Sequence, residues 1–130
     1  MKTVVVDTNV YCHAMRGDPA SARLLRQSEQ LVLPVVVIGE LLAGFKGGGR
    51  ERGNKDQLYA FAQTERVRVA DVTTSTAEFY SLVLNQLREK GTPIPTNDIW
   101  IAAITIEQGA GLATTDSHFR KIEGLYLVEW

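Results

Sequence analysis

Four acidic residues along the chain have the types and positions that a metal site requires: Asp7, Glu40, Asp98 and Asp116. Asp7 directly follows the apolar, β-branched segment 2–6, and Asp116 follows the predicted strand 112–114. Asp98 lies in the first turn of a predicted helix. In open parallel sheets, sites form beyond the carboxyl ends of the strands. We therefore expect these carboxylates to converge there despite their separation in sequence.

The three aspartates and the glutamate differ in how easily a structural role explains them. Aspartate is a common helix N-cap, so each aspartate alone is explained as a cap. Glu40 lies on a predicted helix whose residues three and four positions away are Val36, Val37, Ala43 and Gly44. A charge on such an apolar stripe is costly unless a cation compensates it. The alternative for Glu40 is a salt bridge to a lysine or arginine.

Oxygen ligands of this kind favour a hard cation, Mg²⁺ or Mn²⁺, which also accepts substrate phosphate as a ligand. The single Cys12 and the two histidines, His13 and His118, have no spacing typical of zinc ligands. Neither histidine has an obvious catalytic partner in the sequence, and we expect both to be surface or packing residues. The chain also contains no G-x-S-x-G nucleophile motif.

A basic segment follows the helix that carries Glu40. Its four cations lie around Glu51 in a glycine-rich stretch predicted to be a flexible loop, and they are Lys46, Arg50, Arg52 and Lys55. The segment is either a solvated loop or a contact for the phosphate backbone of RNA beside the acidic site.

Hydrophobic periodicity predicts strands that alternate with helices. The predicted strands are 2–6, 31–33, 67–69, 112–114 and 126–128. The predicted helices are 10–15, 20–30, 35–45, 56–65, 73–90, one capped by Thr96–Asp98 that ends near 108, and a short one ending at 121. This alternation indicates an α/β fold, with a mainly parallel sheet of four to five strands and helices on both faces. We expect a single domain over residues 1–130. The order of the strands does not follow from the pattern.

Composition sets the class of protein. The chain has 130 residues, of which 45% are apolar and 22% are charged, as in an ordinary globular domain, so disorder is not expected. The longest apolar run, 31–39, is too short to span a membrane, and no signal peptide is evident. A lone cysteine fits the reducing cytoplasm. A net charge of −1 does not by itself indicate nucleic-acid binding, although bound cations would offset the carboxylates.

The motifs that carry these residues resemble the PIN-domain family, and specifically VapC-type toxins of bacterial and archaeal toxin–antitoxin pairs. The similar segments run in order along nearly the whole chain, and they are 4–10, 39–41, 97–103, 112–119 and 123–127. The resemblance implies an endoribonuclease that uses Mg²⁺ or Mn²⁺, forms a homodimer, and is inhibited by a small antitoxin that inserts a segment into the site. By position, all four acids match the acidic quartet of the family. The polar residues that steady the quartet would be Thr8, Asn9 and Thr114. The last acidic position varies in the family, so Asp116 is the acid least certain to be essential.

The chemistry implied is metal-aided hydrolysis of a phosphodiester, which leaves a 5′-phosphate and a 3′-hydroxyl. Asp7 and Asp98 would bind the metal directly. Asp116 would be a further ligand, directly or through water. Glu40 would be a ligand or a base that orients the attacking water.

Three alternatives stand beside the toxin hypothesis. A PIN-domain nuclease in RNA processing would have the same site. A non-catalytic RNA- or protein-binding module would be expected to lack one or more acids, whereas all four are present. A phospho-accepting receiver-like domain would need paired acids after the first strand and a late lysine after a strand. Asp7 stands alone there, and Lys121 falls in a predicted helix. Candidate dimer surfaces are the apolar faces of helices 35–45 and 73–90, which core packing explains equally well.

Overall fold

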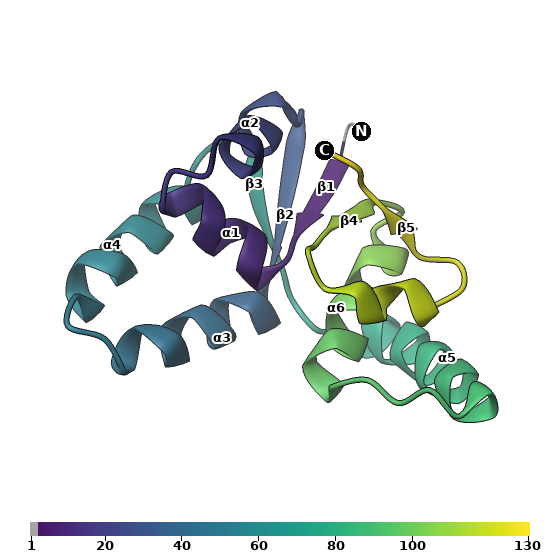
Figure 1. The fold of residues 1–130 in the computed structure, drawn as a ribbon. Coiled ribbons are helices and arrows are strands. Elements are labelled where there is room, and N and C mark those ends of the chain that lie inside the picture. The colour runs from purple at the N-terminus through teal and green to yellow at the C-terminus, as the bar shows by residue number, and fades with distance from the viewer. Residues whose placement is uncertain (1–2) are drawn as a thin grey trace.

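The computed structural model describes residues 3–130, which form one five-stranded parallel sheet flanked by helices (Figure 1). The strands are β1 (Thr3–Val6), β2 (Gln30–Pro34), β3 (Val67–Ala70), β4 (Gly111–Ala113) and β5 (Tyr126–Leu127). The helices are α1 (Thr8–Met15), α2 (Pro19–Gln27), α3 (Val35–Lys46), α4 (Glu51–Ala62), α5 (Thr74–Lys90), α6 (Thr96–Glu107) and the 3₁₀ helix η1 (Ser117–Lys121). The predicted α/β class with a parallel sheet is confirmed.

The strand order is β3-β2-β1-β4-β5, so β1 lies at the centre of the sheet. It pairs in parallel with β2 on one side and β4 on the other, and Val5 lies opposite both Val32 and Leu112. Val5 and its two partners are completely buried. Strands buried on both faces are continuous apolar runs in sequence, which is why these segments were recognisable.

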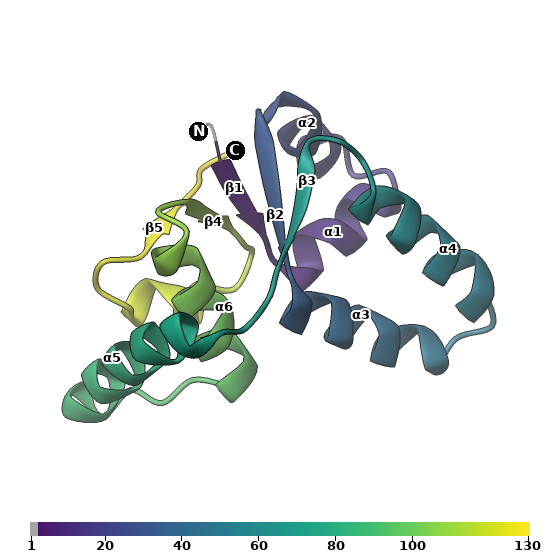
Figure 2. The ribbon, with the colours of Figure 1, turned by 180° about the vertical axis from the view of Figure 1, so that it is seen from behind.

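The helices form two groups on either side of the central strand (Figures 1 and 2). Helices α1 to α4 lie on the side of β2 and β3, whereas α5, α6 and η1 lie on the side of β4 and β5. The first turn of α1 follows directly from β1, and the first turn of α3 follows directly from β2. The carboxyl ends of the central strands therefore open between the two groups of helices. None of the helices described combines the length and the apolar composition that a membrane crossing requires.

Several boundaries differ from the sequence prediction by a few residues, and the start of α4 and the end of α2 are among the largest differences. Helix α4 begins at Glu51 rather than at residue 56, so the connection from α3 covers only residues 47–50. The helix tolerates Gly53 because Leu58, five residues later, is completely buried and holds the helix against the core. Helix α2 ends at Gln27 because Ser28 turns to an extended conformation and its hydroxyl donates to the Leu24 carbonyl. The predicted first strand included Lys2, which lies outside the described residues.

Candidate active site

Asp7 lies where β1 becomes α1, and its carboxylate is held by two donors. Its side chain accepts a hydrogen bond from the Thr8 backbone N–H at 2.8 Å, so it is the N-cap of α1. The Thr114 hydroxyl donates to its other oxygen at 2.6 Å. Thr114 reaches Asp7 because β4 pairs with β1, as the hydrogen bond from the Asp7 N–H to the Ala113 carbonyl shows. Asp7 is only 3% exposed, so this carboxylate has few other partners.

Asp116 is connected to Asp7 through the same threonine. The Thr114 hydroxyl oxygen accepts a hydrogen bond from the Asp116 N–H at 3.0 Å, which fixes the turn between β4 and η1. Asp116 occupies the N-cap position of η1, but its side chain makes no capping hydrogen bond there. Capping therefore does not explain its carboxylate, which remains available to the cleft.

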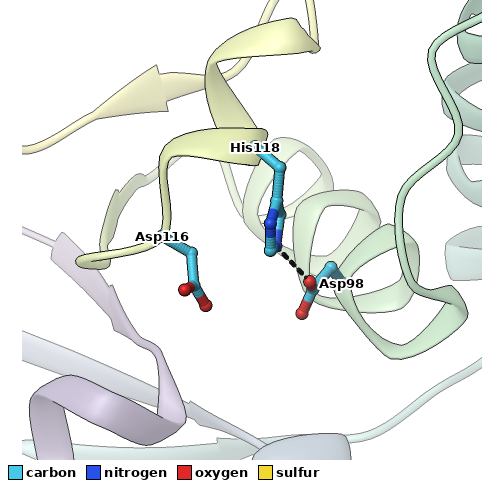
Figure 3. Close-up of side chains that lie close together, drawn as sticks. All are labelled: Asp98, Asp116 and His118. Atoms are coloured by element: carbon cyan, nitrogen blue, oxygen red, sulfur yellow. Dashed lines mark hydrogen bonds and ion pairs between the residues drawn. The ribbon is translucent and has the colours of Figure 1, made fainter.

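Asp98 is not a helix cap, contrary to the simplest explanation for it. The N-cap of α6 is Pro95, and Asp98 is the third residue of the helix, 8% exposed. A proline cap offers no side-chain acceptor, and Asp98 makes no capping bond. Its carboxylate instead points from the first turn of α6 towards Asp116 and His118 (Figure 3).

Glu40 makes hydrogen bonds to neutral groups rather than a salt bridge. One oxygen accepts from the Thr8 hydroxyl at 2.7 Å, and the other accepts from the Asn97 side-chain amide at 3.4 Å. Within residues 3–130 no lysine or arginine forms an ion pair with Glu40, so the salt-bridge alternative is wrong. Asn97 was not predicted as a site residue, although it directly precedes Asp98 in the sequence.

The expectation that His118 has no partner in the site is also wrong. Its Nε2 forms a hydrogen bond with Oδ2 of Asp98 (Figure 3). One donor atom each from His118, Asp98 and Asp116 lie within 4.8 Å of one another. The signal in the sequence was the spacing Asp116-Ser117-His118 immediately after a strand. His13, by contrast, lies in the last turn of α1 and does not line the acidic cleft.

These side chains line one open cleft of about 570 Å³ at the carboxyl ends of the strands. Its walls include the four acids, Thr8, Asn9, Asn97 and His118. Asn9 contributes an exposed side chain from the first turn of α1.

An adjoining groove of about 760 Å³ lies among α1, α3 and α4. It shares Thr8 and Glu40 with the acidic cleft and is also lined by Arg16, Arg50 and Asn54. The cleft and the groove are therefore continuous at Thr8 and Glu40, and the groove has both polar and apolar lining residues.

The electrostatics of the cleft disfavour four ionised carboxylates. Burial raises the pKa of Asp7 to about 6, although the hydrogen bonds from Thr114 and Thr8 lower it, and Asp116 and Asp98 raise it further. Burial also raises the pKa of Asp98, His118 lowers it, and Asp116 and Glu40 raise it. A bound cation would relieve both the burial cost and the repulsion.

The donor set fits a divalent metal ion. Carboxylate oxygens are the ligands that Mg²⁺ and Mn²⁺ prefer, and the imidazole is a further donor for Mn²⁺ or other transition metals. The carboxylates have no basic partner besides His118 among the ion pairs of residues 3–130. The cleft thus has the composition of a metal centre rather than of a structural ion-pair network.

Comparison with known proteins shows the family to which this fold belongs. The family model for the PIN domain matches residues 4–125. The chain belongs to the PIN-domain family. Ribonuclease VapC2 of Rickettsia felis is 27% identical, over 97% of this chain and 96% of its own length. The structure of VapBC-1 from nontypeable Haemophilus influenzae has 26% identity and a TM-score of 0.85, covering 98% of each chain. A second similar structure is that of VapBC2 from R. felis, bound to a DNA fragment from its promoter. It has the same fold, with a TM-score of 0.86 and 24% identity over 98% of each chain.

The basic segment of this PIN domain is not the flexible loop that its glycines predicted. Lys46 ends α3 and forms an ion pair with Glu51 at 3.2 Å, both side chains being well exposed. Arg52 and Lys55 lie exposed on α4. Of the four cations, Arg50 alone lines the groove beside the cleft.

Proposed function

We propose that this PIN-domain protein is an endoribonuclease that requires Mg²⁺ or Mn²⁺ and acts as the toxin of a type II toxin–antitoxin pair. The observation that carries the proposal is the convergence of four carboxylates, unpaired with lysine or arginine within the described residues, in an open cleft. Its relatives named as VapC ribonucleases support RNA as the substrate. The VapBC structures of similar fold support a small antitoxin as the partner.

In the proposed mechanism, Asp7, Asp98 and Asp116 would hold the metal ion. When bound, the ion would polarise the scissile phosphate and lower the pKa of a water molecule. Glu40 would orient that water and accept its proton. In-line attack of the water on phosphorus would break the bond to O3′, which would leave with the bonding electrons and take up a proton from solvent, so the products would carry a 5′-phosphate and a 3′-hydroxyl. The 2′-hydroxyl takes no part in this route.

The neutral residues around the acids would keep them in position. Thr114 donates to Asp7, and its oxygen fixes the turn that carries Asp116. Thr8 and Asn97 donate to the two oxygens of Glu40, which limits its rotation. Asn9 has its exposed amide in the cleft, where it would contact the substrate phosphate.

The groove beside the cleft is the proposed path for the RNA strand. Arg16 and Arg50 supply positive charge for phosphates, and Asn54 supplies an amide that can bond to base edges. The Tyr11 hydroxyl lies buried beside this groove without a hydrogen-bond partner in the described part of the chain. Lys46, Arg52 and Lys55 would then make weaker contacts, from outside the groove.

The decisive experiment is cleavage of RNA by the wild type, Asp7→Asn and Asp98→Asn, each with and without Mg²⁺ or Mn²⁺. We expect cleavage only by the wild type and only with metal, with 5′-phosphate ends on the products. Asp71→Asn is the matched control, because this exposed aspartate lies outside the cleft. Activity that survives both site substitutions would refute the mechanism.

The toxin role needs a separate test in cells. Induced expression of the wild type should arrest growth, and Asp98→Asn should not. Co-expression of a small protein from the reading frame immediately upstream should restore growth. Growth unaffected by an active nuclease would instead indicate a role in RNA processing.

We further propose that residues 1–130 fold as a single domain and that two copies form a homodimer in the cytoplasm, as the resemblance to VapC-type toxins implies. Sedimentation analysis should give twice the chain mass of 14.4 kDa. A monomer at micromolar concentration would contradict this assembly.

A further inference from the structure

We infer that His118 is a direct ligand of the divalent cation, and that this nitrogen donor makes the site prefer Mn²⁺ to Mg²⁺. The inference rests on the proposed metal site and adds to it a residue outside the four carboxylates. It starts from the position of the imidazole between two acids that come from different parts of the chain (Figure 3).

The three side chains converge closely enough to share one ion. Nε2 of His118, one oxygen of Asp98 and one of Asp116 lie within 4.8 Å of one another. Two ligands on opposite sides of an Mg²⁺ or Mn²⁺ ion are separated by about 4.2 Å, because each bond is about 2.1 Å long. Small side-chain rotations would therefore bring all three atoms into one coordination shell.

A purely structural hydrogen bond explains only part of this geometry. A bond between His118 and Asp98 would need no third group, yet Asp116 is also directed at the pair (Figure 3). The carboxylate of Asp116 has no capping role that would otherwise explain its direction. The His118 side chain remains 30% exposed at the cleft, so an ion can reach it.

The local fold holds the imidazole at the cleft. The next residue, Phe119, is completely buried and anchors η1 to the core. On the other side of His118, at the N-terminal end of this short helix, the bond from the Asp116 N–H to Thr114 fixes the turn. His118 lies between these two fixed points, so its backbone is held at the edge of the cleft. A ligand held in advance in this way costs less entropy to order when the ion binds.

The type of donor atom determines which metal ion binds more tightly. Imidazole is a better ligand for transition metals than for Mg²⁺, which favours oxygen. Replacing His118 by asparagine should therefore weaken binding of Mn²⁺ by about tenfold or more. Binding of Mg²⁺ should weaken much less, so the preference for Mn²⁺ should fall.

The experiment uses pulsed electron paramagnetic resonance of Mn²⁺ bound to tag-free protein, which detects a nitrogen nucleus coordinated to the ion. The chain has only two histidines, so the variants His118→Asn and His13→Asn show which imidazole coordinates the ion. We expect nitrogen coupling in the wild type and in His13→Asn, and its loss in His118→Asn. Calorimetric titration of the same proteins with Mn²⁺ and Mg²⁺ gives the change in preference.

The outcomes separate this inference from the proposed function. Mn²⁺ bound without imidazole coupling in the wild type would overturn the inference and leave the carboxylate site intact. Coupling that persists in His118→Asn would overturn it as well. A wild type that binds no Mn²⁺ at all would overturn both. Because the first readout is on the wild type, instability of a variant does not weaken the test.

Discussion

Asp7 combines deep burial with a negative charge that its two hydrogen bonds only partly stabilise. Its pKa of about 6 lies above the ordinary value of 3.8, and burial is the main cause. At neutral pH the metal-free protein must therefore carry a buried charge that costs stability. A residue that weakens the empty protein in this way is typical of a site whose charge serves binding or catalysis.

We predict that this cost appears as a pH dependence of the melting temperature of metal-free protein. Between pH 4 and pH 6 the folded state binds more protons at Asp7 than the unfolded state, so this residue destabilises the fold as the pH rises. At pH 7.5 the cost is roughly 3 kcal/mol. Asp7→Asn, which carries no charge, should be more stable than the wild type at pH 7.5, and the difference should vanish near pH 4. A wild type more stable than Asp7→Asn at pH 7.5 in the presence of a chelator would contradict this.

At the residue scale, the sequence indicated all four acids through local patterns. Asp7 and Asp116 follow predicted strands, Asp98 lies at the start of a predicted helix, and Glu40 lies on an apolar helix stripe. It missed His118 and Asn97 because their partners are distant in sequence. His118 contacts Asp98, 20 positions away, and Asn97 contacts Glu40, 57 positions away. Such contacts depend on how α6, α3 and η1 pack, which local patterns do not specify.

The helix ends show which local signals were reliable. Gly91 ends α5 with φ of 68°, in the left-handed region, as its position after the last periodic residue predicted. The glycines at 47–49 have ordinary backbone conformations, and they did predict the end of α3 but not the short length of the connection. Burial of Leu58 extended α4 beyond what propensity alone indicates, because tertiary packing outweighs a single glycine.

We predict that Gly91→Ala lowers the free energy of unfolding by about 1 kcal/mol, because a side chain in the left-handed region is strained. An added Cβ would meet no atom within 4 Å, so the effect would come from the backbone alone. Gly49→Ala is the control: its Cβ is equally free, and its φ is not positive. Urea unfolding of both variants measures the difference. Equal stability of the two would refute the backbone explanation.

At the junction of α3 and α4, we predict that Arg50→Ala weakens RNA binding and reduces its salt dependence. Loss of one phosphate contact should lower the slope of log K against log salt by about 0.7 for a single strand. Fluorescence anisotropy in the inactive Asp98→Asn background measures this without cleavage. Arg52→Ala, which changes an exposed arginine outside the groove, should have a smaller effect. Identical slopes for the two variants would place the RNA elsewhere.

For the whole molecule, the class of fold could be predicted but the order of its strands could not. Alternating strands and helices indicated a parallel sheet, whereas the position of β1 between β2 and β4 is set by contacts over more than 100 residues. That order is what brings Thr114 beside Asp7. The site is thus a property of the complete sheet.

We predict that millimolar Mn²⁺ or Mg²⁺ raises the melting temperature of the protein. An ion at 100 times its dissociation constant adds about 2.7 kcal/mol to the free energy of unfolding, which corresponds to a rise of several degrees. Differential scanning calorimetry measures it, with sodium chloride of equal ionic strength as the control. Asp98→Asn should abolish most of the rise. No rise for the wild type would exclude a preformed site.

The central position of β1 also affects when the protein becomes active during its synthesis. Proteins fold from the amino-terminal end as they are translated. Here β1 pairs with β4, which is made more than 100 residues later. Until then β1 lacks one of its two neighbouring strands. Asp116 and His118 emerge only after that strand. A nascent chain therefore holds at most two of the four acids until Asp98 has been made, and it lacks the complete cluster until Asp116 and His118 follow.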